Sequence, residues 1–232
     1  MKKRLIPLMG LSAFGMLLAS CGGTSTWSWE KASEDGVLNY ALLIGQVDHN
    51  DSAARTAGIR EALGTRPTEH NANANMESPV KGSLKLGDKT FEVNEVAHGE
   101  QKSTAGATWD QQTATVSTEA WLNANPDIDF FVSNNDGMAE GAIGASNWVD
   151  GMPIFGYDSN QSTLQYIKDG KIMGTINQNA PAQAAAIYMA ARNAVDGLTG
   201  EDVYTKGFTA DSTNGYGKIA SKVTYGADAH SL

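Results

Sequence analysis

The sequence predicts an α/β fold in which a parallel β-sheet is flanked by helices. From position 37 onward, short apolar segments of strand length alternate with longer segments of helical length. This alternation is typical of parallel strands joined by crossover helices. The first apolar segment, Val37 to Ile44, is nearly continuous, as expected for a strand that is buried on both faces.

The predicted elements follow in order along the chain. They are strand 37–44, helix 51–63, a hairpin with strands 83–86 and 89–93, helix 109–123, strand 128–132, helix 136–148, strand 153–156, a helix from 160 to before Gly170, strand 171–176 and helix 181–195. Asn50 or Asp51 can cap the first long helix. Gly87-Asp88 lies between two alternating segments, which is a hairpin-turn signal. We interpret residues 64–108, which interrupt the regular alternation, as an insertion that carries this small β-hairpin.

The first twenty residues have the pattern of a signal peptide. Three cations, Lys2, Lys3 and Arg4, precede a mostly apolar stretch from 5 to 18, which is too short for a comfortable membrane span. The chain's single cysteine, Cys21, follows Leu18-Ala19-Ser20 and resembles the lipidated cysteine of a bacterial lipobox. We therefore expect a signal peptide at 1–20 and a lipid-anchored tether at 21–35. An ordinary signal peptide with a stray cysteine is the alternative.

Composition excludes several classes of protein. The chain has 232 residues, 41% of them hydrophobic, and a net charge of −9. This apolar content argues against a chain that is disordered along its whole length. The acidic balance without a basic block argues against a nucleic-acid partner. One cysteine permits no internal disulfide and no cysteine-based zinc site.

Polar side chains gather where the predicted strands end. Ligands of an open parallel sheet bind beyond the carboxyl ends of its strands, and the residues found there are His49, Asp51, Arg55, Asn134, Asn135, Asp136, Asp158 and Asn177. The chain has no glycine-rich phosphate loop, no Gly-x-Ser-x-Gly elbow and no His-Glu-x-x-His motif, so an enzyme is the weakest hypothesis. A dense polar set without a nucleophile suits a neutral polyhydroxylated ligand, because each hydroxyl both donates and accepts hydrogen bonds.

Spacing leaves alternatives open for individual members of this set. Asp51 and Arg55 are four residues apart and share a helix face, which also describes an ordinary surface ion pair. Asp158 and Asn177 are of residue types common at strand ends and caps. Trp109 is equally explained as a core aromatic residue or as an aromatic anchor at the start of a helix. The interpretation depends on the set as a whole.

Several motifs in order along the chain resemble one known family. They are Ala41-Leu42-Leu43-Ile44-Gly45, His49-Asn50-Asp51-Ser52-Ala53-Ala54-Arg55-Thr56, Trp109-Asp110, Ser133-Asn134-Asn135-Asp136-Gly137-Met138-Ala139, Phe155-Gly156-Tyr157-Asp158 and Gly174-Thr175-Ile176-Asn177. The chain from about Gly36 to its C-terminus, apart from the insertion, is similar to the glucose/galactose-binding proteins of bacterial ABC importers, which have the periplasmic-binding-protein type I fold.

The resemblance implies a role for each site residue. His49, Asp51, Arg55, Asn135, Asp158 and Asn177 would hydrogen-bond a monosaccharide, and Trp109 would stack on an apolar face of the sugar. The resemblance further implies an ABC permease as partner, no enzymatic activity and no cofactor. With Cys21 lipidated, the expected location is the outer face of the cytoplasmic membrane, at the cell surface or in the periplasm.

Two departures from the family accompany the resemblance. The family's first lobe has no counterpart in this sequence, so helix 181–195 would need another partner, such as a separate first-lobe chain. The alternative is a remnant that serves as an interaction or surface-antigen module. The family's calcium loop corresponds to Lys31, Ser33, Asp35, Val37, Asn39 and Asp129. Lys31 and Ser33 replace oxygen ligands at the leading positions, so no metal is expected.

Overall fold

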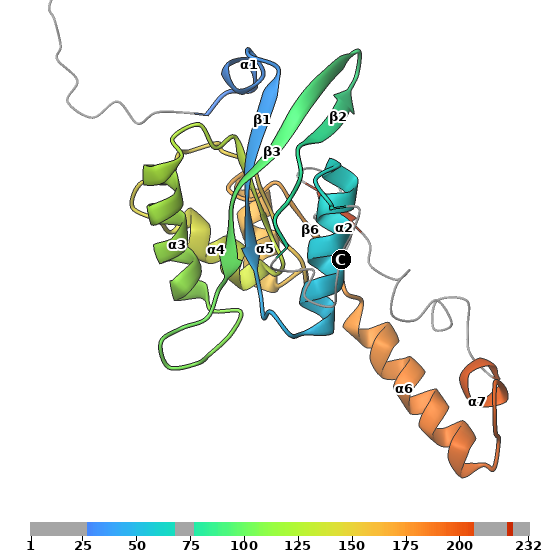
Figure 1. Ribbon diagram of the computed structural model, residues 1–232. Coiled ribbons are helices and arrows are strands. Elements are labelled where there is room, and N and C mark those ends of the chain that lie inside the picture. Colours follow the sequence, from blue (N-terminus) through green and yellow to red (C-terminus); the bar gives the residue numbers. More distant parts are fainter. Residues whose placement is uncertain (1–26, 68–76, 207–221, 225–232) are drawn as a thin grey trace, which may run out of the picture.

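The computed structural model describes residues 27–67, 77–206 and 222–224. Within these ranges seven strands form one sheet in the order β2-β3-β1-β4-β5-β6-β7, with helices on both faces (Figure 1). The predicted signal peptide and Cys21 lie outside the described residues. No helix in the described part of the chain is both long and apolar enough to cross a bilayer.

The strands are short except for β1 and β3. They are β1 Val37–Ile44, β2 Gly82–Leu86, β3 Lys89–Glu100, β4 Phe130–Ser133, β5 Ile154–Phe155, β6 Gly174–Ile176 and β7 Lys222–Thr224. The helices are α1 Trp29–Ala32, α2 Asn50–Leu63, α3 Gln111–Ala124, α4 Asp136–Ile143, α5 Gln161–Lys168, α6 Ala180–Val195 and α7 Asp202–Thr205. The predicted α/β class, with a mostly parallel sheet and flanking helices, is confirmed.

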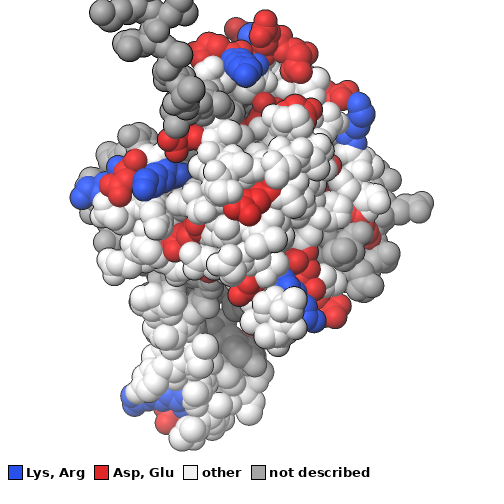
Figure 2. All heavy atoms as spheres, turned by 90° about the vertical axis from the view of Figure 1, so that its left-hand side faces the viewer, with Lys and Arg blue, Asp and Glu red and all other residues white. Residues whose placement is uncertain are grey.

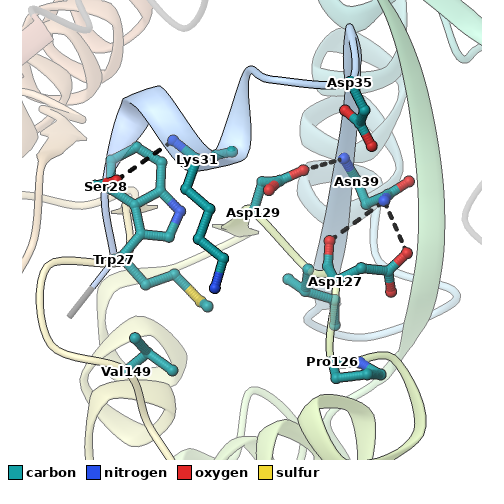
Figure 3. A pocket seen from close by; sticks show the side chains of 12 residues that line it. Trp27, Ser28, Lys31, Asp35, Asn39, Pro126, Asp127, Asp129 and Val149 are labelled. Atoms are coloured by element: carbon teal, nitrogen blue, oxygen red, sulfur yellow. Dashed lines mark hydrogen bonds between the residues drawn. The ribbon is translucent and has the colours of Figure 1, made fainter. Parts of the chain in front are cut away.

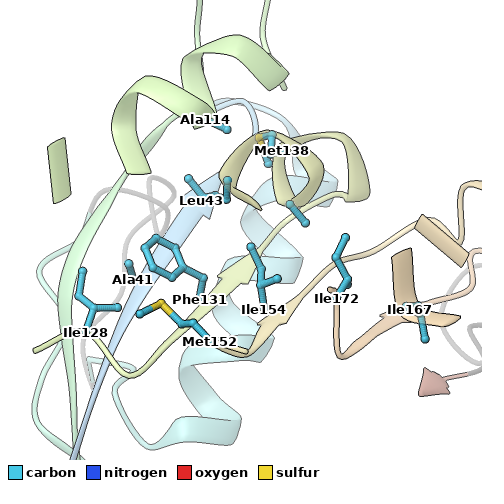
Figure 4. Close-up of a cluster of buried hydrophobic side chains, with 12 residues drawn as sticks. Ala41, Leu43, Ala114, Ile128, Phe131, Met138, Met152, Ile154, Ile167 and Ile172 are labelled. Carbon is cyan, nitrogen blue, oxygen red and sulfur yellow. The ribbon is translucent and has the colours of Figure 1, made fainter. Parts of the chain in front are cut away.

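The position of β1 in the sheet explains why its sequence is almost continuously apolar. It pairs in parallel with β3 on one side and β4 on the other. Leu42 and Ile44 contribute to a core that includes side chains of α2, whereas Ala41 and Leu43 point into the opposite core. Figure 4 shows the second core, in which side chains of β1, α3, α4 and β5 meet. Both faces of β1 are therefore dry, as expected for a central parallel strand.

Within the segment 64–108, β2 and β3 are strands of the main sheet, which corrects the interpretation that the segment only inserts a small hairpin. The predicted hairpin exists, because β2 and β3 pair antiparallel across the Gly87-Asp88 turn. Strand β3 then continues to Glu100 and pairs in parallel with β1 from Val37 to Ile44. Its second half was missed because it carries charged residues, and Glu95 among them is fully buried.

The buried charge of Glu95 is compensated by its neighbours. Arg60 of α2 donates to both carboxylate oxygens through Nη2 and Nε, at 2.5 and 2.8 Å. Tyr40 Oη donates to Glu95 Oε2 at 2.5 Å, and His98 Nδ1 lies 3.0 Å from Oε1. Burial alone would raise the pKa of Glu95, but these partners hold it below its usual value. A charged strand can therefore occupy the interior of the sheet.

Residues 27–35 of the predicted tether pack on the folded body, and residues 21–26 lie outside the described residues. Ser28 caps α1 through its hydroxyl, and Trp27 N donates to Asp150 O at 3.0 Å. The ring of Trp29 packs edge-on against Phe91 with centroids 5.7 Å apart. This aromatic contact and the backbone hydrogen bond hold the segment on the sheet.

Several predicted boundaries shift by a few residues. Helix α4 ends at Ile143 instead of Trp148, because the chain turns at Gly144 and Ala145. Strands β5 and β6 are shorter than predicted, at two and three residues. Strand β7, which was not predicted, pairs antiparallel with β6 and closes that edge of the sheet.

Helix α6 leaves the body of the molecule and projects away from it together with α7 (Figure 1). Asn193 joins the two helices by donating to backbone oxygens of Val203 and Lys206 at 3.1 and 2.9 Å. Ile187, Tyr188 and Val195 are 71%, 63% and 86% exposed. In Figure 2 this projection is mostly uncharged except near its tip. The face of α6 that carries these exposed apolar side chains is therefore not covered by any of the described residues.

Candidate functional site

A depression of about 230 Å³ lies at the carboxyl edge of the parallel strands. It is lined by His49, Asp51, Arg55, Trp109, Asn135, Asp158 and Gln178. These residues follow β1, β3, β4, β5 and β6, so five strand ends contribute. The chain runs from β1 to β3 on one side and then to β4 on the other, so the depression lies where a doubly wound sheet reverses its strand order. Six of the seven side chains predicted from the sequence meet here.

Arg55 holds the centre of this group. Its Nη1 donates to the backbone oxygen of Asn134 at 2.7 Å and lies 3.3 Å from Asp158 Oδ1. Its Nη2 lies 3.8 Å from Asp51 Oδ2, which is the i,i+4 pair expected from the sequence. The Arg55 side chain is only 11% exposed. It is therefore a fixed donor and not a solvated surface charge.

Asp158 is a partly buried acceptor with two donors from within the protein. Gln178 Nε2 and Arg55 Nη1 both donate to its Oδ1. Burial raises the pKa of Asp158 to about 6, although the hydrogen bond from Gln178 and the charge of Arg55 each lower it. Asp158 is thus ionised at neutral pH and close to protonation in mild acid.

His49 and Trp109 form the aromatic wall of the depression. Their rings meet edge-to-face with centroids 5.6 Å apart. His49 caps α2, and its Nδ1 accepts from Asp51 N at 3.2 Å. The proton of the neutral imidazole is therefore on Nε2, which becomes a donor for a ligand. The Trp109 indole supplies an apolar surface next to these polar groups.

Buried polar residues hold this arrangement from below. Asn134 is fully buried, and its Oδ1 accepts from Gly45 N, Ser52 Oγ and Thr56 Oγ1 at 3.3, 2.9 and 3.2 Å. It thereby fastens the end of β4 to β1 and α2. The next residue, Asn135, caps α4 by accepting from Met138 N at 2.9 Å. These bonds fix the backbone from which the site side chains project.

Asp136 makes the corresponding link to β6 and α5. It is fully buried and accepts from Thr175 Oγ1 at 2.6 Å and from Asn160 N at 2.8 Å. Burial raises its pKa above the usual value. Gly156 is required beside it, because a Cβ there would overlap the Asp136 carboxylate.

Asn177 is not among the residues that line the depression, and Gln178 lines it instead. The Asn177 side chain accepts from Asn179 N at 2.7 Å, so it is used in the local turn before α6. Asn177 pairs through its backbone with Asp158 as an isolated parallel bridge. Successive side chains along an extended segment point to opposite sides. A shift of one residue at the end of β6 therefore decides whether the amide of Asn177 or that of Gln178 faces the depression. The Asn177-Gln178 pair in the sequence was the signal that both positions had to be considered.

The backbone around the site is strained. Within the described residues, the non-glycine residues with positive φ are Trp109, Asp158, Ser159 and Asn179, at 58°, 127°, 64° and 52°. Two of these line the depression, and the other two are adjacent to residues that do. Such conformations cost of order 1–3 kcal/mol each and are concentrated at functional sites. The positive-φ residues of the described part of the chain therefore cluster at the depression.

The lining chemistry favours binding over catalysis. The side chains offer imidazole, guanidinium, amide and carboxylate groups around one aromatic surface. Among the lining residues there is no serine, cysteine or threonine nucleophile. No group of three or more histidine, cysteine or acidic residues suited to a metal ion occurs in the described part of the chain.

A second cavity, of about 210 Å³, lies at the opposite end of β1 (Figure 3). Asp35, Asp127 and Asp129 line it, together with Lys31 and Asn39. Asp129 Oδ2 accepts from Asn39 N at 2.8 Å. Burial raises the pKa of Asp129 to about 6, and the charges of Asp35 and Asp127 add to the shift. Four of the six positions compared above with a calcium loop, Lys31, Asp35, Asn39 and Asp129, line this cavity.

Comparisons with known proteins agree with the fold. The model of the periplasmic binding protein domain family matches residues 10–199. The D-galactose/methyl-galactoside binding periplasmic protein MglB of Haemophilus influenzae is 29% identical over 169 residues, which cover 71% of this chain and 42% of that protein. The D-ribose/D-allose-binding protein of Pseudomonas aeruginosa is 30% identical over 96 residues, 40% of this chain and 30% of that protein.

Solved structures show the same fold. An ABC transporter solute-binding protein of Bacillus halodurans with bound myo-inositol has a TM-score of 0.51 at 25% identity, covering 75% of this chain and 56% of that chain. A periplasmic solute-binding protein of Actinobacillus succinogenes with bound D-allose has a TM-score of 0.52 at 24% identity, covering 73% and 50%. This chain spans less than half the length of the curated relatives that it matches. With the family model matching most of its length, the chain belongs to the periplasmic binding protein domain family.

Proposed function

We propose that this chain is the monosaccharide-binding lobe of an ABC importer's solute-binding protein, with a sugar of the glucose/galactose type as ligand. The observation that carries the proposal is the meeting of His49, Asp51, Arg55, Trp109, Asn135 and Asp158 around one depression. A sugar presents hydroxyls that need both donors and acceptors, and apolar C–H faces that pack on an aromatic ring. The depression offers both kinds of contact side by side.

Each side chain has a distinct place in this proposal. Asp51 and Asp158 are anionic acceptors for sugar hydroxyls, and hydrogen bonds to charged groups are roughly twice as strong as neutral ones. Arg55, His49 and Asn135 are donors. Gln178 replaces Asn177 as the amide contributed by the segment before α6. Relatives whose names state that they bind galactose, ribose or allose support this ligand class.

Binding of purified protein to sugars tests the proposal directly. We expect calorimetry or NMR titration of residues 22–232 to show binding of D-galactose or D-glucose, with weaker binding of D-ribose. Asp158→Asn should weaken binding about tenfold or more, because a charged hydrogen bond is worth about 1.5–3 kcal/mol. Asp88→Asn, in the exposed hairpin turn, is the matched control and should bind like the unchanged protein. Absence of binding to all three sugars at 50 mM or more would overturn the proposal.

We also propose that the lobe is a half-receptor that requires a first-lobe partner chain. The depression is open on one side, and the apolar face of α6 around Ile187 and Tyr188 is exposed. Sites that enclose their ligand bury about 70–90% of its surface. With one lobe alone, loss of three or four hydrogen bonds weakens affinity roughly a thousandfold. We therefore expect a dissociation constant in the millimolar range, and micromolar affinity of the isolated chain would contradict the half-receptor model.

The exposed face of α6 also favours the second candidate, an interaction module outside transport. The two models differ in how sugar responds to a partner. A first-lobe chain should tighten sugar binding, and Tyr188→Asp should abolish that effect without changing the weak binding of the isolated lobe. A partner that occupies α6 and leaves sugar affinity unchanged would favour the interaction module.

Anchoring through Cys21 completes the proposal. Cys21 follows a basic and then apolar leader in the sequence. We expect the mature protein to begin with a diacylated cysteine at the outer face of the cytoplasmic membrane, and Cys21→Ser to release it into the soluble fraction. Mass spectrometry of the native N-terminus checks this. Processing at another residue would contradict the anchor.

A further inference from the structure

The guanidinium of Arg55 lies on the face of the Tyr157 ring. The Cζ atom of Arg55 is 3.8 Å from the centroid of that ring and 5.5 Å from the centroid of Trp109. Tyr157 does not itself line the depression. Its ring therefore contacts the central donor of the site from outside the ligand-facing surface.

We propose that Tyr157 is a positioning residue, which holds the Arg55 guanidinium in the orientation that presents donors to the ligand. The inference depends on the proposed sugar-binding function only for its effect on affinity. The contact between the two side chains can be tested without a ligand.

The hydrogen bonds of Arg55 do not by themselves fix the orientation of its guanidinium. Asn134 O, Asp158 Oδ1 and Asp51 Oδ2 engage the guanidinium through Nη1 and Nη2. Hydrogen bonds of this kind lie near the plane of the group. These in-plane hydrogen bonds restrain the guanidinium within its plane more strongly than they restrain its movement out of that plane. A ring against one face supplies the missing restraint, because a guanidinium both stacks on an aromatic ring and is attracted by its quadrupole.

Tyr157 is well placed to act as a fixed surface. Its backbone oxygen accepts from Asp136 N at 2.7 Å, and Asp136 is fully buried. On either side of it, Gly156 N donates to Gly174 O at 2.9 Å and Asp158 N donates to Ile176 O at 2.8 Å. These bonds fasten the segment to α4 and β6. The backbone that carries the ring is therefore anchored independently of Arg55.

The proposal predicts that the ring matters and the hydroxyl does not. Tyr157→Phe keeps the aromatic face, whereas Tyr157→Leu removes it and retains an apolar side chain of moderate size. Tyr166→Leu is the matched control. Tyr166 also stacks with a cation, Lys171 at 5.7 Å, but it lines a different cavity.

The first measurement is an NMR spectrum of the arginine side chains in the sugar-free protein, with the Arg55 signal assigned by its loss in Arg55→Gln. We expect a ring-current shift of the Arg55 Nε–H signal that is retained in Tyr157→Phe and Tyr166→Leu and lost in Tyr157→Leu. An unchanged Arg55 signal in Tyr157→Leu overturns the proposal, whether or not any sugar binds.

The second measurement is a double-mutant cycle on D-galactose affinity. Tyr157→Leu should weaken binding about fivefold to tenfold, and Tyr157→Phe should restore affinity to within about twofold. In an Arg55→Gln background, Tyr157→Leu should have no further effect, because its action passes through Arg55. Additive losses would show that Tyr157 acts independently of Arg55 and would overturn the proposal. If no variant or parent binds sugar, the proposed function fails, while the spectrum still decides the role of Tyr157.

Discussion

The indole of Trp109 lies directly against Gly45, so closely that a Cβ at position 45 would overlap the ring. Gly45 follows the last residue of β1, and Trp109 precedes α3 with a φ of 58°. A strained backbone thus places the indole flat over a position that has no side chain. The aromatic wall of the depression depends on this pairing.

Gly45→Ala should therefore displace Trp109. We expect the free energy of unfolding to fall by about 1–3 kcal/mol from the overlap, together with a loss of sugar affinity. Gly58→Ala, in α2 where a Cβ meets nothing, is the control and should stabilise by about 0.5–1 kcal/mol. Chemical denaturation with tryptophan fluorescence measures both changes. Equal stability of the two variants would contradict the close contact.

Sugar binding should depend on pH through Asp158. Its pKa of about 6 in the folded protein means that the carboxylate becomes protonated as pH falls through 6 and loses its anionic acceptor character. We expect affinity for galactose to be weaker at pH 5 than at pH 7.5. Asp158→Asn should bind weakly at both values, with a flatter profile between them. A parent profile that is flat between pH 5 and 7.5 would exclude this role.

Stability should depend on pH through Asp129. Its pKa is raised from 3.8 to about 6 on folding, so the folded protein binds a proton at Asp129 more tightly than the unfolded chain does. This group's contribution is most favourable below pH 4 and is lost as pH rises through 6. Asp129→Asn should therefore be more favourable at pH 7 than at pH 4, where each effect is the change in the free energy of unfolding relative to the parent. The amide oxygen can still accept from Asn39 N, so this hydrogen bond is kept at both pH values. Denaturation at both pH values, with Asp88→Asn as control, checks the sign.

Ser159 combines two unfavourable features. Its φ is 64°, and its Oγ is buried without a hydrogen-bond partner. Ser159→Ala should remove only the unpaired hydroxyl, while Ser159→Gly should also relieve the backbone. We expect Ser159→Gly to raise the melting temperature above that of Ser159→Ala, by an amount equivalent to about 1 kcal/mol. Scanning calorimetry distinguishes them, and a lower value for the glycine variant would argue against strain.

The ion pair between Arg60 and Glu95 should dominate the stability of the β1–β3–α2 region. The two side chains are 1% and 0% exposed, so Glu95→Gln removes the carboxylate that both bonds and neutralises a buried guanidinium. We expect a loss of about 3–5 kcal/mol. Glu92→Gln is on the same strand and breaks the exposed pair with Lys81, which should change the free energy of unfolding far less because solvent screens that pair. Urea denaturation compares them, and similar losses would show that burial of the pair is unimportant.

Much of the fold could be predicted because local patterns agree with it. The apolar run of β1 coincides with the observed strand from Val37 to Ile44, and Asp51 and Arg55 were correctly placed on one helix face. Strand β3 beyond Val93 could not be predicted from its own residues. Its charged Glu95 is tolerated inside the sheet only because Arg60, 35 residues earlier, is packed against it.

The sequence by itself determined which chemical groups the depression contains, because strand ends and helix starts fix where polar residues such as His49 and Asn135 emerge. Only the tertiary structure decided which amide, Asn177 or Gln178, reaches the depression, because that depends on the end of β6 and the turn before α6. It also decided that Tyr157 lies under Arg55. That contact joins the segment after β5 to a helix more than 90 residues earlier, and no local pattern specifies a pairing over that separation.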